Sequence, residues 1–194
     1  TKPTDVYGVK IDTLNSNPET ALTYIDSSVG FTPATGNNGA FNYGSWEDKF
    51  PFNEIKPCVL KNGVVQYYLN PNDYTQKIDG GVADITTGDD GDVMVEFPKI
   101  YWKFETIGTD LYIRYSDQKV DSNYKCLAHT RGVEEKDKAY LSAYMGYIDV
   151  SKLRSLSGKT PTVQINMDDF RTQAQANGTG YEQMSYYQLL MLQV

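Results

Sequence analysis

The chain has 194 residues, a length that suits one domain with a sizeable hydrophobic core. Its 25 acidic residues outnumber the 18 basic ones, which gives a net charge of −7, and neither sign collects into a block. This pattern argues against nucleic-acid binding, which needs clustered Lys and Arg. No apolar run approaches the roughly 20 residues that cross a bilayer, so we also expect no membrane insertion.

The first predicted elements are two short strands. Tyr7, Val9 and Ile11 alternate with polar residues, as in a half-buried strand over residues 6–12. Residues 21–25 predict a second strand that pairs with the first.

A linker is expected next. Residues 27–45, which include Gly36-Asn37-Asn38-Gly39, offer little apolar area to offset the entropy of ordering. We therefore divide the chain into an N-terminal arm over residues 1–45 and a main domain over residues 46–194. A strand on such a tether predicts pairing with a neighbouring subunit, and hence a homo-oligomer or a larger assembly.

Asn62-Gly63 lies between the apolar runs 58–61 and 64–69. Both residues of a tight hairpin turn must accept positive φ, and Asn-Gly does so readily, which predicts an antiparallel hairpin. Residues 74–88 are mixed in polarity and predict a loop with one turn of helix.

The densest pattern is residues 92–104. Val93, Val95 and Phe97 alternate in one phase, whereas Ile100, Trp102 and Phe104 alternate in the other, so the phase changes at Pro98-Lys99. We expect two short strands joined at a bulge or kink, because proline donates no ladder hydrogen bond.

A second hairpin is predicted over residues 100–105 and 111–116. We expect both hairpins to share one sheet, with Trp102 buried because its face is too apolar to leave in water. Residues 139–150 predict a further strand.

Helices are expected at the end of the chain. Asn166 or Asp168 can cap a helix over residues 169–176, which Asn177-Gly178 closes. A second helix is predicted from Tyr181, with an apolar stripe that must pack on the sheet. The stripe consists of Met184, Tyr187, Leu190, Met191 and Val194. Because it is still running at the last residue, and the chain begins at Thr1 without methionine, we expect a fragment truncated within a helix.

No spacing typical of a catalytic or metal site is present. Cys58 and Cys126 have apolar neighbours and no CxxC spacing, so we interpret them as buried thiols, although a disulfide between them stays open. His129 has no identifiable nucleophile near it in sequence and is expected at the surface or in a hydrogen bond.

Two acidic or amide-rich turns could suggest calcium. Asn70-Pro71-Asn72-Asp73 superficially resembles the turn with which calcium-dependent lectins hold calcium and sugar, but it directly follows a hairpin strand and is interpreted as a turn. Asp89-Asp90-Gly91-Asp92 lacks the twelve-residue spacing of a calcium loop. We therefore predict no catalytic residue, metal or cofactor, and leave the binding residues unassigned.

Three segments in order carry a family resemblance. They are Tyr-Gly-Val-Lys-Ile-Asp at 7–12, Tyr-Leu-Asn-Pro-Asn-Asp-Tyr at 68–74, and Asp-Gly-Asp-Val-Met-Val-Glu-Phe-Pro-Lys-Ile-Tyr-Trp-Lys at 90–103. The chain resembles bacteriophage and prophage structural proteins, which are similar to the C-type-lectin-fold group of phage tropism determinants and formylglycine-generating-enzyme-like domains.

The resemblance implies an α+β fold, in which a C-type-lectin-like antiparallel sheet packs with two helices behind a short β-containing arm. It also implies a non-enzymatic virion component, such as a tail, decoration or adhesion protein. Its expected partners are other virion proteins, further copies of itself, and a host-surface glycan or protein, and its expected location is the virion. The alternatives are a calcium-dependent carbohydrate-binding lectin and a formylglycine-generating-enzyme-like oxidoreductase, whose reactive cysteines could only be Cys58 and Cys126.

Overall fold

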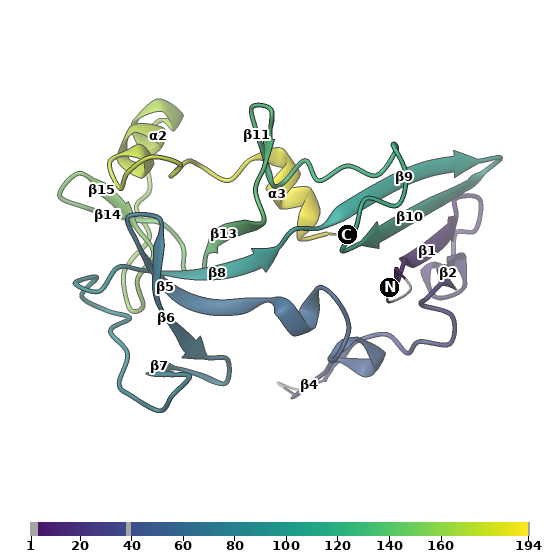
Figure 1. Cartoon of the computed structure of the whole chain (residues 1–194), viewed down its shortest axis with the longest axis horizontal. Helices are drawn as coiled ribbons and strands as arrows, with labels where there is room; N and C mark the ends of the chain where they lie inside the picture. The colour runs from purple at the N-terminus through teal and green to yellow at the C-terminus, as the bar shows by residue number, and fades with distance from the viewer. Residues whose placement is uncertain (1–3, 38–39, 194) are drawn as a thin grey trace. The chain divides into compact units, whose positions relative to one another are not determined.

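The chain is mainly β in its computed structural model, which describes residues 4–37 and 40–193 (Figure 1). Strands account for 38% of the structure and helices for 13%, and the strands form several small antiparallel sheets. The predicted α+β class, with one C-type-lectin-like sheet and two helices, is therefore wrong. The strands were mostly located correctly, but their grouping into sheets was not.

The chain folds into two units. The first unit comprises Thr1–Glu54, Pro98–Lys138 and Tyr186–Val194. The second unit comprises Ile55–Phe97 and Ala139–Ser185. This grouping differs from the expected boundary at Trp46, because the N-terminal strands belong with the hairpin that follows Pro98.

The first unit is built on a four-stranded antiparallel sheet in the order β2-β1-β10-β9. Its strands are β1 (Tyr7–Asp12), β2 (Leu22–Asp26), β9 (Tyr101–Ile107) and β10 (Asp110–Ser116). The predicted β1–β2 pair and the second hairpin are confirmed. The prediction that β1 pairs with a neighbouring subunit is wrong, because β2 and β10 of the same chain occupy its two edges.

The expected linker contains local structure. Its short elements are β3 (Thr35–Asn37), β4 (Ala40–Asn42) and a 3-10 turn, η1 (Gly44–Trp46). Asn38 and Gly39 lie outside the described residues. Phe31 packs edge-on against Trp46 with 5.0 Å between ring centroids, so this segment is anchored to the first unit and is not a free tether. The remaining helical turns of this region are α1 (Pro18–Ala21) and η2 (Phe52–Glu54).

The second unit is built on a five-stranded sheet in the order β13-β8-β5-β6-β7. Its strands are β5 (Lys56–Lys61), β6 (Val64–Asn70), β7 (Asp73–Lys77), β8 (Asp92–Pro98) and β13 (Lys138–Ser142). The Asn62-Gly63 hairpin is confirmed, with φ of 52° and 77° at the two turn residues. The start of the expected loop over residues 74–88 instead forms β7.

The phase change at Pro98-Lys99 separates the two sheets. β8 ends at Pro98 in the five-stranded sheet, and β9 begins at Tyr101 in the four-stranded sheet. Two short strands are thus confirmed, but the two hairpins do not share one sheet. Trp102 is buried as predicted, at 3% exposure, whereas Phe104 of the same face is 42% exposed.

Several short strands complete the chain. They are β11 (Thr130–Arg131), β12 (Glu134–Glu135), β14 (Tyr147–Asp149) and β15 (Lys152–Arg154). The single strand predicted over residues 139–150 is split into β13 and β14. At Gly146, just before β14, a Cβ atom would lie 2.8 Å from Leu153 Cδ1, so a larger residue here would require the Leu153 side chain to move.

Each unit has its own core. In the second unit, Val59, Leu69, Ala83, Ile85 and Val93 form a buried cluster. In the first unit, Tyr101, Tyr124 and Cys126 form another. No helix of the described residues is long and apolar enough to cross a membrane.

The first predicted helix is confirmed as α2 (Met167–Gln175). Asn166 caps it by accepting the Asp169 N–H at 2.8 Å, and Gly178 follows its end with φ of 127°.

The second predicted helix is reduced to α3 (Tyr186–Met191). Residues 181–185 form no helix, and Gln183 donates to the Met167 carbonyl of α2 at 3.2 Å. Met184 and Tyr187 are exposed, so the stripe does not pack on a sheet as predicted, although Met191 is buried. Val194 lies outside the described residues.

Candidate functional site

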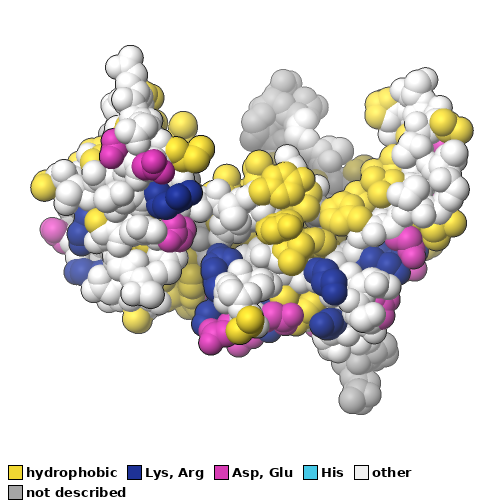
Figure 2. All heavy atoms as spheres, turned by 90° about the horizontal axis from the view of Figure 1, so that it is seen from above, with side chains coloured by type: hydrophobic (Ala, Val, Ile, Leu, Met, Phe, Trp, Pro, Cys, Tyr) yellow, Lys and Arg dark blue, Asp and Glu magenta, His cyan; other side chains and the backbone are white. Residues whose placement is uncertain are grey.

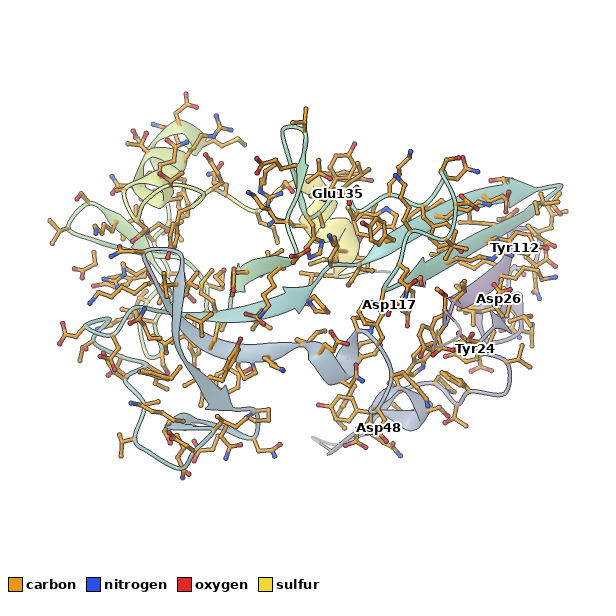
Figure 3. All side chains as sticks on the ribbon, viewed as in Figure 1. Tyr24, Asp26, Asp48, Tyr112, Asp117 and Glu135 are labelled. Atoms are coloured by element: carbon orange, nitrogen blue, oxygen red, sulfur yellow. The ribbon has the colours of Figure 1, made fainter. Side chains whose placement is uncertain are left out.

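The two faces of the β2-β1-β10-β9 sheet differ in chemistry. Residues directly opposite each other across antiparallel strands share a face. One face carries three rows, which are Asp26-Tyr7-Tyr115-Trp102, Tyr24-Val9-Ile113-Phe104 and Leu22-Ile11-Leu111-Thr106. Asp26 ends β2 with a positive φ of 55°, and its carboxylate contacts Arg114 of the other face. The other face carries mostly charged residues. Figure 3 labels Tyr24 on β2 and Tyr112 on β10, which belong to opposite faces.

The charged face is neutralised within the chain. Arg114 Nε lies 2.7 Å from an Asp26 carboxylate oxygen, and Arg114 Nη1 lies 3.2 Å from Glu105. Lys10 pairs with Asp110 at 3.3 Å. Partly exposed pairs of this kind contribute little stability, about 0–1 kcal/mol each. Because acidic and basic groups alternate, this face offers no concentrated charge for a charged ligand.

Aromatic rings cover one end of the mainly apolar face, which carries the rows of Tyr7, Tyr24 and Leu22. This aromatic cluster consists of Tyr7, Tyr24, Phe31, Trp46, Phe52 and Tyr115. Tyr7 stacks on Tyr115 with 5.4 Å between ring centroids, and burial raises the pKa of both phenols. These two tyrosines therefore act as apolar core residues and do not ionise near neutral pH.

The rest of that face is open. We call it the apolar strip, and it consists of Val9, Ile11, Leu22, Phe104, Leu111 and Ile113. Leu22 and Phe104 are 43% and 42% exposed, and the other four are half-buried. Phe52, which is 45% exposed, extends this uncovered surface from the aromatic cluster. Figure 2 shows uncovered groups of hydrophobic side chains on the face of the molecule that it displays.

The candidate nucleophiles do not form a reactive site. Cys58 and Cys126 are buried and form no disulfide, as the sequence suggested. Burial, and then hydrogen bonding to Glu135, raise the pKa of the Cys126 thiol, whereas a nucleophilic cysteine needs a lowered pKa. Glu135 also accepts a hydrogen bond from Tyr101 at 2.5 Å. His129 is only 1% exposed, so of its two expected settings the surface is wrong, and the hydrogen bond stays a prediction.

The Asn70–Asp73 segment is a turn, as predicted, joining β6 to β7. Asn70 Oδ1 accepts the Asn72 N–H at 3.0 Å, and Asp73 Oδ1 accepts the Thr75 N–H at 3.0 Å, so local bonds use these oxygens. In Asp89–Asp92, the Asp92 carboxylate faces Arg154 at 2.9 Å. Among residues 4–37 and 40–193, no three His, Cys, Asp or Glu side chains are grouped to hold a metal.

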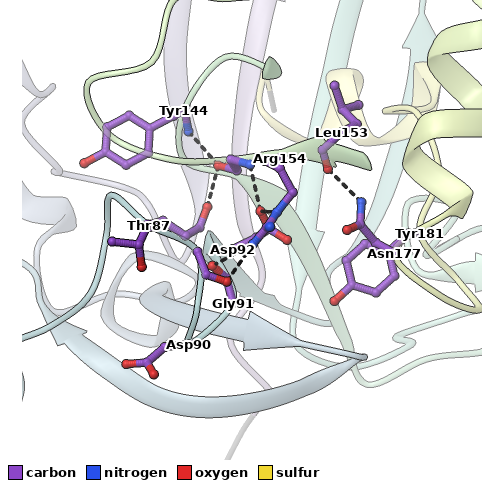
Figure 4. Close-up of polar contacts among 12 residues, drawn as sticks. Thr87, Asp90, Gly91, Asp92, Tyr144, Leu153, Arg154, Asn177 and Tyr181 are labelled. Atoms are coloured by element: carbon purple, nitrogen blue, oxygen red, sulfur yellow. Dashed lines mark hydrogen bonds and ion pairs between the residues drawn. The ribbon is translucent and has the colours of Figure 1, made fainter. Parts of the chain in front are cut away.

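Two buried polar clusters of the second unit were missed by the sequence analysis. Glu96 is 3% exposed and accepts hydrogen bonds from Tyr68 at 3.2 Å and Tyr140 at 2.9 Å. Asp92 and Arg154 form the other (Figure 4). The sequence feature that could have indicated both clusters is the alternation in β8, where Asp92 and Glu96 share the strand with valines. Their partners Tyr140 and Arg154 are too distant in sequence to be paired from the pattern alone.

Asp84 organises the loop before β8. Its Oδ1 accepts the N–H groups of Thr86 at 3.1 Å and Thr87 at 2.9 Å, and its Oδ2 accepts the Asp89 N–H at 3.1 Å and the Thr87 hydroxyl. Burial raises the pKa of Asp84, but the hydrogen bonds outweigh burial and hold it well below its usual value of 3.8.

We expect Asp84→Asn to lower the free energy of unfolding by about 1–3 kcal/mol at neutral pH, because an amide NH₂ cannot accept the bonds made to one carboxylate oxygen. A depressed folded-state pKa stabilises above the unfolded pKa, and this stabilisation is lost as pH falls through the folded pKa. The gap between wild type and variant in urea unfolding should therefore narrow between pH 7 and about pH 2.

Asp79→Asn is the matched control for Asp84. Asp79 Oδ1 accepts one bond, from the Gly81 N–H at 3.1 Å, which asparagine can retain. A gap between wild type and Asp84→Asn that stays constant with pH would contradict the role assigned to the Asp84 carboxylate.

Comparisons of the chain with protein-family models, with curated proteins and with solved structures find no match. The resemblance to phage structural proteins therefore remains an expectation from the residues at 7–12, 68–74 and 90–103.

Proposed function

We propose that the chain is a non-enzymatic binding component of a bacteriophage virion, a tail, decoration or adhesion protein, and that it binds through the apolar strip. The observation that carries the binding role is the exposure of Leu22 and Phe104, at 43% and 42%, beside the half-buried apolar residues of the same strip. Uncovered apolar patches of this kind mark interaction sites more often than scattered single residues do.

The arrangement of the strip favours a protein surface as partner. The aromatic cluster fixes one end of the sheet face, so the half-buried side chains beside it are held on regular strands. Fully burying one such aliphatic side chain contributes about 1.5–3 kcal/mol, and several in a row suffice for a specific contact. The paired charges on the opposite face give no comparable driving force.

Two further features support a non-enzymatic virion role. Both cysteines are buried, and the pKa of the Cys126 thiol is raised, which disfavours oxidoreductase chemistry of the formylglycine-generating type. The virion assignment rests on the resemblance of three ordered segments to phage structural proteins. Other virion proteins are the proposed partners.

The test is incorporation into particles. The gene is deleted in the bacterium that encodes the chain and replaced by tagged wild type or Leu22→Asp, and particles purified on a density gradient are quantified by mass spectrometry. We expect wild type in the particles and Leu22→Asp reduced about tenfold, because a charge on the strip opposes apolar burial.

Leu14→Asp is the matched control, since Leu14 is 77% exposed in the loop after β1 and lies outside the strip. It should be incorporated like wild type, and urea unfolding should show that both variants are folded. Absence of the wild-type chain from particles would overturn the virion role. Equal incorporation of both variants would overturn the assignment of the strip.

A further inference from the structure

β9 forms one edge of the four-stranded sheet. The hydrogen bonds of Trp102, near the start of β9, show the direction in which its backbone N–H and C=O groups point. The Trp102 N–H donates to the Lys125 carbonyl at 2.9 Å, and the Lys125 N–H donates back to Trp102 at 2.9 Å. The backbone groups of Trp102 therefore point away from β10. Because the direction alternates along a strand, those of Phe104 and Thr106 point the same way.

Beyond Trp102 this edge is open. Within residues 4–37 and 40–193, no hydrogen bond reaches the outward N–H or C=O of Phe104 or Thr106. Both residues are exposed, as is Ile107 at 55%. Open edges of this kind are templates for a further strand.

We propose that a second copy of this chain pairs with β9, antiparallel, across a two-fold axis at Glu105. In this register Phe104 lies opposite the partner's Thr106, and Thr106 lies opposite the partner's Phe104. Both outward residues of each copy then exchange backbone hydrogen bonds. The phenylalanines of the two copies become diagonal neighbours on the apolar face, within reach of aromatic side chains.

The charges near the axis are compatible with this register. Glu105 faces the partner's Glu105, but each glutamate already has two cations beside it. Arg114 Nη1 lies 3.2 Å from one Glu105 oxygen, and Lys103 Nζ lies 3.3 Å from the other. Each cation is shared with a second carboxylate, Arg114 with Asp26 at 2.7 Å and Lys103 with Asp121 at 3.8 Å. Each Glu105 is therefore ion-paired within its own copy and brings no unpaired charge to the axis. Lys103 lies opposite the partner's Ile107, whose side chain its aliphatic stem can cover.

A second copy fits this edge better than a head-to-tail chain of sheets. At the opposite edge, Leu22 of β2 is the C-cap of α1, and the Asp26 carbonyl accepts the Val29 N–H at 3.3 Å. In the described chain, Tyr24 is then the outward residue of β2 whose backbone N–H and C=O take no part in such contacts. Pairing of β9 with β9 uses twice as many outward residues and closes as a dimer. It also places both apolar strips on one side of a continuous sheet.

The first test removes one backbone donor. Thr106→Pro deletes the outward N–H of Thr106 without breaking a bond to β10, since proline is tolerated at such edge positions. Thr106→Val keeps the N–H and the strand preference and serves as the control. In sedimentation velocity up to about 100 μM, we expect wild type and Thr106→Val to dimerise, and Thr106→Pro to dimerise at least about tenfold more weakly.

The second test is cross-linking at the axis. Facing residues of a non-hydrogen-bonded pair have Cβ atoms close enough for a disulfide, so oxidised Glu105→Cys should form a covalent dimer. Ile107→Cys, opposite the partner's Lys103, should cross-link far more slowly, and the native cysteines are buried.

Three outcomes would overturn the dimer. They are a monomeric wild type at every concentration, undiminished dimerisation of a folded Thr106→Pro, and equal cross-linking of the two cysteine variants. The dimer and the proposed virion function fail separately, because Leu22→Asp leaves the β9 backbone intact and Thr106→Pro leaves the strip intact.

Discussion

Replacing Arg154 by alanine is expected to lower the free energy of unfolding by about 3–5 kcal/mol, because it strands a buried carboxylate. Arg154 Nε donates to Asp92 Oδ1 at 2.9 Å, and the two side chains are only 14% and 10% exposed. Arg154 also donates to the carbonyls of Gly88 at 2.9 Å and Gly91 at 3.3 Å (Figure 4). After the substitution, the Ser155 N–H is the hydrogen-bond donor that Asp92 retains among the described residues.

Urea unfolding at neutral pH measures this loss. Arg171→Ala on the exposed side of α2 is the matched control and should change stability by less than about 0.5 kcal/mol. The double variant Arg154→Met with Asp92→Leu should be more stable than Arg154→Ala, because replacing both charges leaves no buried group uncompensated. A loss below about 1 kcal/mol in Arg154→Ala would show that the pair is solvated and does not fix β15 to β8.

Local features of the fold could be predicted because their causes are local. Asn62-Gly63 supplies both positive φ angles of its turn within two residues. Asn166 caps α2 through an N–H only three residues away. The phase change at Pro98-Lys99 also located the ends of β8 and β9. Each of these patterns is complete within a short window of the sequence.

The grouping of strands could not be predicted in the same way. β1 pairs with β10, about a hundred residues later, whereas β5 pairs with β8 in the other sheet. Alternation shows that a strand has an apolar face but does not say which strand lies beside it. The one-sheet prediction failed for this reason.

The sequence analysis identified only part of the candidate site. Tyr7, Val9 and Ile11 were identified as one strand face, and Trp102 was predicted to be buried. The exposure of Phe104 depends on the aromatic rings covering only the Tyr24 end of its row, a consequence of where Trp46 packs. The open edge at Thr106 depends on the bridge from Trp102 to Lys125, which no periodicity indicates.

Replacing Gly91 by alanine adds one methyl group, and we expect no other added methyl group to destabilise the second unit more. Gly91 has φ of 139°, and an added Cβ would lie 2.4 Å from the Leu60 carbonyl oxygen and 2.8 Å from its carbon. Backbone atoms cannot give way as a flexible side chain can. The strand pair would have to move just where Leu60 faces Asp92.

We expect Gly91→Ala to lower the free energy of unfolding by about 3–5 kcal/mol, combining a disfavoured φ with the overlap. Gly80→Ala separates the two contributions, because Gly80 also has a positive φ, of 90°, but a Cβ there meets nothing within 4 Å. Gly80→Ala should lower the free energy of unfolding by about 1–2 kcal/mol, because only the backbone conformation is disfavoured there. Urea unfolding of both variants gives the comparison, and equal losses would mean that β8 can shift away from Leu60 without disturbing the Asp92–Arg154 pair.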